Sequence, residues 1–149
     1  MRPRPRLAPL AATLLLSTLL AACHEPTGVG GDISRHRARW AAHVIASYDY
    51  DYELDGFFID FAGRPVRVEV RDGAVRSATD VATGQPMPQA LTTWPTVEQL
   101  FDTAERAAAA GSLRAVRYDP TYDYPTSLEL DGPPDASGSV TASGLVPVR

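Results

Sequence analysis

Strict alternation of apolar and polar residues predicts two strands in the first half of the chain. Residues 48–55 place an acid after each apolar side chain, in the order Tyr-Asp-Tyr-Asp-Tyr-Glu-Leu-Asp. Residues 65–71 alternate in the same way, with valines at positions 66, 68 and 70. Because successive side chains of a strand point to opposite faces, each segment predicts a strand with one buried and one solvated face.

A tight hairpin is expected at Asp72-Gly73, which directly follows the second of these strands. The third strand then runs from Ala74 to about Asp80. A two-residue loop predicts three cross-strand pairs: Arg71 with Ala74, Val70 with Val75 and Glu69 with Arg76. This register puts Val70 and Val75 on the buried face and an ion pair outside.

Apolar residues recur at helical spacing in two further segments. Ile33–Ser47 is expected to form a helix, with Asp32 or Ser34 as its N-cap and an apolar stripe of Ile33, Trp40, Ala41, Val44 and Ile45. A second helix follows the capping box Thr96-Val97-Glu98-Gln99 and is expected to stop at Gly111. Its stripe consists of Val97, Leu100, Phe101, Ala104 and Ala108.

The C-terminal part predicts a fourth strand at Leu113–Tyr118, a fifth at Thr126–Leu130, and an edge strand at Val140–Val146. The resulting fold class is α+β, with two layers. An antiparallel sheet of five to six strands carries two helices packed on it, in the order α-β-β-β-α-β-β(-β).

The first 23 residues match a bacterial lipoprotein signal. Met1–Arg6 carries three arginines, and Leu7–Leu20 is an apolar run too short for a membrane span, which needs about 20 apolar residues. Leu20-Ala21-Ala22-Cys23 then matches the lipobox. We expect cleavage between Ala22 and Cys23 and lipid on Cys23, which anchors the chain to the membrane. An ordinary signal peptide cut near Ala22 and an uncleaved anchor are the alternatives.

This signal sets the expected domain organisation and location. Residues 1–22 are the signal peptide, 23–32 a Gly-rich flexible tether, and 33–149 a single α+β domain. The protein is expected to be exported and lipid-anchored to a bacterial membrane. In a host with two membranes the outer one is favoured, because His24 follows the cysteine where an aspartate would retain the protein in the inner membrane.

Charge and motifs restrict the chemistry that the domain can perform. All fourteen basic residues are arginine. The processed chain would keep eleven of them and all eighteen acidic residues, which gives a formal charge of −7. This negative charge argues against nucleic-acid binding. The single cysteine allows no internal disulfide, and no Cys/His spacing suits zinc. No motif of a nucleophile with its base, of a metalloprotease or of a phosphate loop occurs. We therefore expect no catalytic residues, no metal and no cofactor.

Two groups of residues are candidates for binding. The acids Asp49, Asp51, Glu53 and Asp55 share one strand face and could bind Ca²⁺, or pair across strands with Arg67 and Arg71. The second group could line a carbohydrate or peptide groove, or simply be a loop that packs its own tyrosines. Its members are Tyr118, Asp119, Tyr122, Asp123 and Tyr124.

Several motifs together resemble the DUF6174 family, a bacterial lipoprotein family known only as a domain of unknown function. The most specific are Val66–Val75 and Tyr118–Asp131, within a similarity that covers about residues 38–131. Many members carry a Cys-x-Cys where this chain has Phe57-Phe58-Ile59, so no redox role is carried over. Asp123 stands where a glycine is usual. The resemblance implies an envelope location and this α+β order, and it implies no activity.

These observations favour a lipid-anchored envelope lipoprotein with a non-catalytic binding domain. Its partners would be the membrane, through Cys23, and an envelope protein or a surface polymer. One alternative is a hydrolase with paired carboxylates drawn from Asp49, Asp51, Glu53, Asp119 and Asp123. Another is an inhibitor of a periplasmic enzyme, which predicts a protruding loop at Asp119–Pro125.

Overall fold

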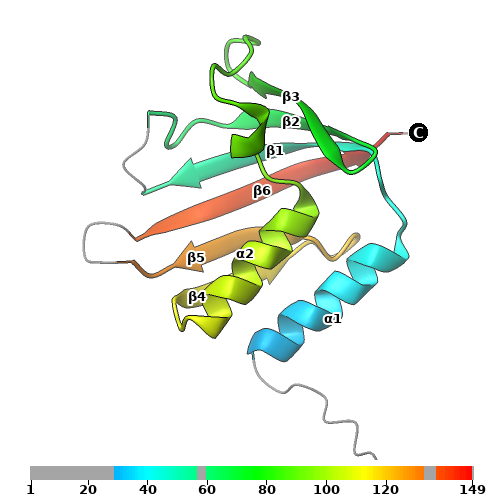
Figure 1. Cartoon of the computed structure of the whole chain (residues 1–149), viewed down its shortest axis with the longest axis vertical. Helices are drawn as coiled ribbons and strands as arrows, with labels where there is room; N and C mark the ends of the chain where they lie inside the picture. The colour runs from blue at the N-terminus through cyan, green and yellow to red at the C-terminus, as the bar shows by residue number, and fades with distance from the viewer. Residues whose placement is uncertain (1–28, 57–59, 133–136, 149) are drawn as a thin grey trace, which may run out of the picture.

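The computed structural model describes residues 29–56, 60–132 and 137–148. In this part of the chain one helix lies across a face of a six-stranded antiparallel sheet, and a second helix packs beside the first (Figure 1). The elements in chain order are α1 (Val29–Ala42), β1 (Tyr48–Asp55), β2 (Val66–Arg71), β3 (Ala74–Asp80), the short 3₁₀ helix η1 (Leu91–Thr93), α2 (Val97–Ala109), β4 (Leu113–Tyr118), β5 (Pro125–Leu130) and β6 (Gly138–Pro147). The expected fold class and order, with the sixth strand present, are confirmed.

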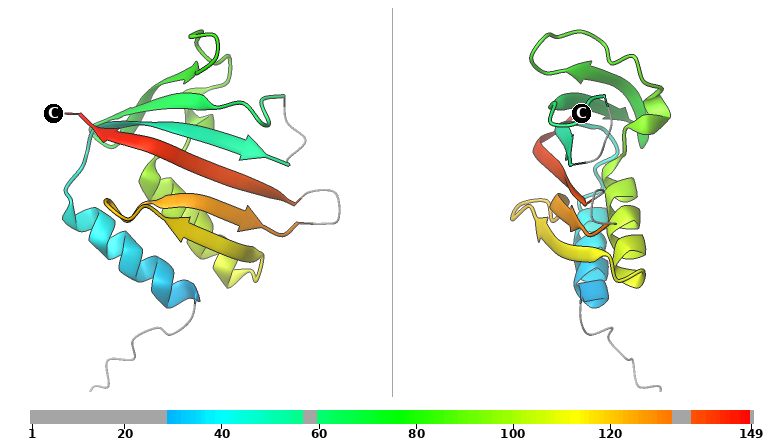
Figure 2. Two further views of the ribbon diagram at one scale, coloured as in Figure 1. Left: turned by 180° about the vertical axis from the view of Figure 1, so that it is seen from behind. Right: turned by 90° about the vertical axis from the view of Figure 1, so that its left-hand side faces the viewer.

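The strand order is β3-β2-β1-β6-β5-β4, so the last strand joins the two halves of the sheet. The prediction of an edge strand at Val140–Val146 is therefore wrong, because β6 pairs with both β1 and β5. Turned by 90°, the molecule shows both helices on the same side of the sheet, while the opposite face is uncovered (Figure 2). The two edge strands of the sheet are β3 and β4.

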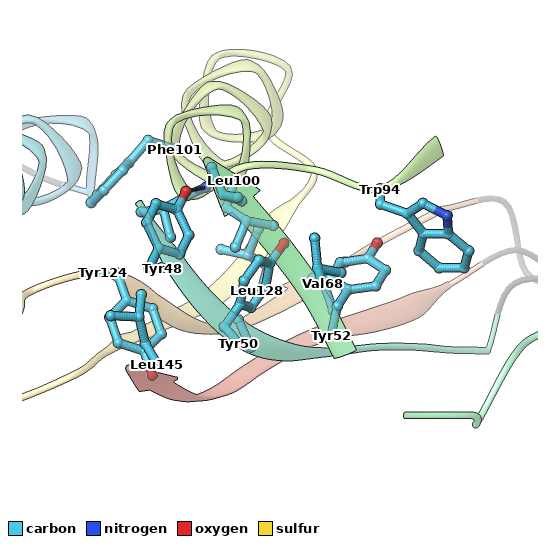
Figure 3. Packing of buried hydrophobic residues seen from close by; sticks show 14 of the residues in the cluster. Tyr48, Tyr50, Tyr52, Val68, Trp94, Leu100, Phe101, Tyr124, Leu128 and Leu145 are labelled. Atoms are coloured by element: carbon cyan, nitrogen blue, oxygen red, sulfur yellow. Dashed lines mark hydrogen bonds between the residues drawn. The ribbon is translucent and has the colours of Figure 1, made fainter. Parts of the chain in front are cut away.

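The core lies between the sheet and α2. The alternation in β1 sends Tyr48, Tyr50 and Tyr52 toward the helices, where at most 7% of each side chain is exposed (Figure 3). The three valines of β2 are fully buried beside them. From above, α2 contributes Val97, Leu100, Phe101 and Ala104, as its apolar stripe predicts.

The hairpin at Asp72-Gly73 forms with positive φ at both residues, 52° and 73°, as a two-residue turn of this kind requires. Val70 pairs with Val75 and Arg71 with Ala74, as expected. The predicted pair of Glu69 with Arg76 is wrong, because a bulge shifts the register and Glu69 faces Ser77. The extra residue reverses the alternation of β3, so Ala78 and Asp80 reach the buried face.

Both predicted ends of the first helix are wrong. The helix begins at Val29, so residues 29–32 of the expected tether are helical, and Ser34 lies inside the helix with its hydroxyl donating to the carbonyl of Gly30 (3.0 Å). It ends at Ala42 instead of Ser47. The carbonyl of Ala46 accepts from Gly73 N (2.8 Å) and that of Ser47 from Val148 N (2.8 Å), so distant segments hold these residues in a non-helical conformation.

Candidate functional site

The loop between β4 and β5, which holds the predicted binding residues, packs against α1. Asp123 Oδ1 lies 2.7 Å from His36 Nδ1 and accepts a hydrogen bond from Arg39 at 3.2 Å. The ring of His36 in turn stacks on Tyr118, with centroids 3.6 Å apart and an interplanar angle of 8°. Two of the candidate residues are thus engaged by side chains of α1.

The tyrosines of this loop belong mainly to the interior. Tyr124 is only 2% exposed and contacts Trp40 edge to face, with centroids 6.3 Å apart. Tyr122 is half-buried against His43 at 5.5 Å. The hydroxyl of Tyr118 is buried and has no hydrogen-bond partner among the described residues. Burial, with a smaller contribution from Asp32 and Glu105, raises the pKa of Tyr118.

Asp119 closes the loop on itself. Its Oδ1 accepts from the backbone N–H groups of Thr121 (2.9 Å) and Tyr122 (2.8 Å), an arrangement typical of an Asx turn. Pro120 and Thr121 are the exposed residues at its tip. Of the five predicted surface residues, Tyr124 is buried and the other four are partly exposed, and hydrogen bonds within the loop and to α1 hold them in place.

Two of the four acids on the acidic face of β1, Asp49 and Asp51, are paired with arginines of β2, as the cross-strand interpretation predicts. Arg67 donates to both carboxylate oxygens of Asp51, at 2.5 and 3.1 Å, and Arg71 donates to Asp49 at 2.6 Å. These pairs raise the pKa values of Arg67 and Arg71, chiefly through their hydrogen bonds to the two aspartates. The described residues contain no group of three His, Cys, Asp or Glu side chains placed to hold a metal ion.

A hollow of about 440 Å³ opens between the C-terminal end of α1, the first turn of α2 and the β2–β3 turn; we call it the α1–α2 pocket. Its lining residues are Trp40, Ala41, Val44, Ile45, Ala46, Asp72, Gly73, Thr96 and Glu98. Mainly apolar residues at the end of α1 line one part of it, and the β2–β3 turn and α2 contribute the acidic residues Asp72 and Glu98. Sequence analysis does not predict this pocket, because its three parts are distant along the chain.

Glu98 is held in place by two aromatic donors. Its Oε1 accepts from Trp40 Nε1 (2.9 Å) and its Oε2 from the hydroxyl of Tyr48 (3.4 Å). That hydroxyl also accepts from Val97 N at 2.8 Å, at the start of α2. Burial is the main reason that the pKa of Tyr48 is raised, so Tyr48 remains a neutral donor. The carboxylate is consequently fixed relative to both helices.

Val44, at the rim of the pocket, has an unusual backbone. Its φ is 53° and its side chain is 86% exposed. A left-handed conformation costs about 1–2 kcal/mol for a residue with a Cβ, and for a β-branched residue it is a true outlier. The strain is not offset by burial. Such outliers concentrate at functional sites.

None of the described helices is long and apolar enough to span a bilayer. The predicted lipidation site, Cys23, and the preceding Ala22 lie outside the described residues, as do Phe57-Phe58-Ile59.

The matching protein-family model is described as a family of unknown function (DUF6174), and it covers residues 32–144. Because the match spans most of the chain, the protein belongs to this family. No curated protein and no solved structure shows a significant match. Asp123, at the position where the resemblance leads us to expect glycine, has φ 62°, a conformation that glycine adopts without strain.

Proposed function

We propose that the protein is a lipid-anchored lipoprotein of the bacterial cell envelope and that its domain is a non-catalytic binding module. The observation that carries the proposal is Leu20-Ala21-Ala22-Cys23 at the end of a short apolar run. Only five residues separate Cys23 from the start of α1 at Val29, and six extended residue steps span roughly 20 Å. Lipid on Cys23 would therefore hold the domain close to the bilayer, with α1 nearest to it.

Binding is favoured over catalysis by the surroundings of the candidate carboxylates. A carboxyl group that acts as general acid needs an apolar environment that raises its pKa. Asp49 and Asp51 are paired with arginines, Asp119 accepts two backbone hydrogen bonds, and Asp123 contacts His36 and Arg39. Four hollows of the described surface, with volumes of about 290 to 440 Å³, are lined by none of these four carboxylates, nor by Glu53.

The anchoring part of the proposal is tested by Cys23→Ser in the full chain, expressed in a Gram-negative host. We expect the variant to keep its signal peptide and to lose acyl labelling. Globomycin, which blocks cleavage after the lipid is attached, should leave the signal peptide on the wild type while the acyl label remains. Ala12→Ser, earlier in the apolar run, is the matched control and should be processed normally. Unchanged processing and membrane fractionation of the Cys23→Ser variant would contradict lipid anchoring.

The binding part is tested by crosslinking intact envelopes and purifying the wild-type protein under denaturing conditions. We expect one envelope protein or surface polymer to be recovered repeatedly. The Cys23→Ser variant, which is not delivered to its membrane, should not recover it. A wild-type sample that yields no specific crosslinked product would speak against a binding module.

A further inference from the structure

The α1–α2 pocket combines apolar side chains with two acidic residues that pair with no basic side chain of the described part of the chain. No arginine or histidine nitrogen of residues 29–56, 60–132 and 137–148 lies within 4.0 Å of the carboxylates of Glu98 or Asp72. The other two acids of α2 differ in this respect, because Asp102 and Glu105 both pair with Arg37, at 2.6 and 2.8 Å. Glu98 thus remains available to a cation from outside the chain.

The position of Glu98 is set in advance of any binding. Trp40 is 4% exposed and Tyr48 is fully buried. The two groups that donate to the carboxylate are therefore fixed in the interior. A carboxylate held in this way loses little conformational freedom when a cation arrives, and preorganisation of this kind favours affinity. The first turn of α2 therefore presents a fixed anionic acceptor at the pocket.

The rim of the α1–α2 pocket supplies an apolar surface that a ligand could contact. Val44 presents an almost fully exposed side chain from a strained backbone, and Ile45 and Ala41 continue the same surface. A ligand with an aliphatic stem would bury Val44 while its charged end reaches Glu98. This pattern fits a long basic side chain better than a small inorganic cation, which would leave the apolar surface exposed.

We propose that the α1–α2 pocket binds an arginine side chain on the surface of a protein partner. The planar guanidinium matches a carboxylate with two parallel hydrogen bonds, which the compact ammonium of lysine cannot form. The methylene stem lies along Val44, and Asp72 adds a second negative charge. This inference rests on the proposed binding role and names the surface and the chemistry of the partner.

The location of the pocket favours a protein over a lipid amine as the source of the cation. The pocket lies at the C-terminal end of α1, whereas Cys23 precedes the N-terminal end of this helix in the sequence. A helix of 14 residues is about 21 Å long at 1.5 Å per residue. The pocket is therefore separated from the tethered end of the domain by the whole length of α1.

The experiment is an NMR titration of the ¹⁵N-labelled full chain in detergent micelles with the capped peptide acetyl-Ala-Arg-Ala-amide. The chain has two tryptophans, so two indole N–H signals are expected. Trp40 Nε1 donates to Glu98 and should shift saturably, with half-saturation on the order of millimolar. Trp94, which lies outside this pocket, is the internal reference and should not move. The same peptide with citrulline, which lacks the charge, should cause at least fivefold smaller shifts.

Two substitutions locate the binding site. Glu98→Gln should weaken arginine binding at least fivefold, and Asp72→Asn should weaken it about twofold while keeping a residue that suits the positive φ of the turn. Asp102→Asn, one turn further along α2, is the matched control and should bind as the wild type does. Equal shifts with citrulline, unchanged binding in both pocket variants, or no saturable shift of Trp40 would overturn the proposal.

A lysine peptide in the same titration tests whether the pocket prefers a guanidinium to an ammonium group. Weaker binding of acetyl-Ala-Lys-Ala-amide supports the guanidinium, and equal or stronger binding overturns the assignment to arginine. Vesicles of phosphatidylethanolamine, presented in place of the peptide, should leave Trp40 unshifted; a shift would mean that the cation is a lipid amine. None of these results depends on processing at Cys23, so failure of the pocket and failure of lipid anchoring are separate outcomes.

Discussion

The two helices lie beside each other on the same side of the sheet, yet they differ in almost every physical respect. α2 has a complete capping box at Thr96 and Gln99 and buries four apolar side chains in its first two turns. α1 buries only Gly31, Ile33 and Trp40 along its length. Their C-terminal ends differ most clearly: α2 is followed by Gly111 with φ 69°, and α1 by Val44 with φ 53°.

This comparison separates a helix that stabilises the fold from one that also presents a surface. Glycine carries no penalty for positive φ, so the end of α2 is unstrained. Valine in that conformation stores strain and leaves an apolar side chain in water. Polar side chains attach α1 to its surroundings through Arg37, His36 and Arg39. We infer that α2 is optimised for the core and α1 for contact with another molecule.

The largest expected effect tests the assignment of the core to α2. Phe101→Ala should lower the free energy of unfolding by about 3–5 kcal/mol, because a fully buried aromatic ring leaves a cavity. Ile33→Ala in α1 should cost about 2 kcal/mol, since a helix with few buried neighbours can move to fill the space. Urea denaturation followed by circular dichroism measures both. Equal losses would remove the energetic difference between the helices.

An intermediate effect is expected at alkaline pH, because the tyrosine row beneath both helices is buried. Burial raises the pKa of Tyr52 from its ordinary value near 10 to about 12, and raises those of Tyr48 and Tyr50 as well. The unfolded chain then loses these protons first, so stability is fully present below pH 10 and falls as the pH rises from 10 to 12.

The contribution of Tyr52 alone is about 1.4 kcal/mol for each pKa unit of the shift. Urea midpoints measured between pH 8 and 12 should therefore fall steadily above pH 10. The Tyr52→Phe variant should lose less stability over that interval, since its ring cannot ionise. An identical pH dependence in the variant would show that Tyr52 is not protected from ionisation by the fold.

The smallest effects on stability are expected at the C-terminal ends of the two helices. Replacing glycine by valine at one end and valine by glycine at the other should change the stability in opposite directions. Gly111→Val should destabilise the protein by about 1–2 kcal/mol, and purely through the backbone, since a Cβ at Gly111 meets no atom within 4 Å. Val44→Gly should stabilise it by about 0.5–1 kcal/mol, because relief of strain exceeds the entropy that glycine loses on folding.

Thermal unfolding of the two end variants provides the measurement. The melting temperature of Gly111→Val should fall and that of Val44→Gly should rise. If valine at position 44 serves binding, Val44→Gly should stabilise the fold and should also weaken binding of the arginine peptide in the NMR titration. A Val44→Gly variant that is less stable than the wild type would mean that this side chain supports the fold, and the contrast between the helix ends would be lost.

Elements whose signals are local could be predicted from the amino-acid sequence. Period-two alternation located β1 and β2, Asp72-Gly73 located the turn, and the capping box with Gly111 bounded α2. In each case the residues that form the element also supply its hydrogen bonds or its buried face. The fold class, and the ion pairs of Arg67 and Arg71, followed from these patterns.

Features that depend on partners distant along the chain are visible only in the folded structure. The end of α1 is set by hydrogen bonds from Gly73 and Val148, and the central place of β6 by pairing on both of its edges. Tyr124 is buried because Trp40 of α1 packs against it, and Tyr122 is half-buried against His43, just after that helix. The α1–α2 pocket exists because the end of one helix, the start of another and a hairpin turn lie close together in the fold. Their spacing along the chain does not predict this proximity.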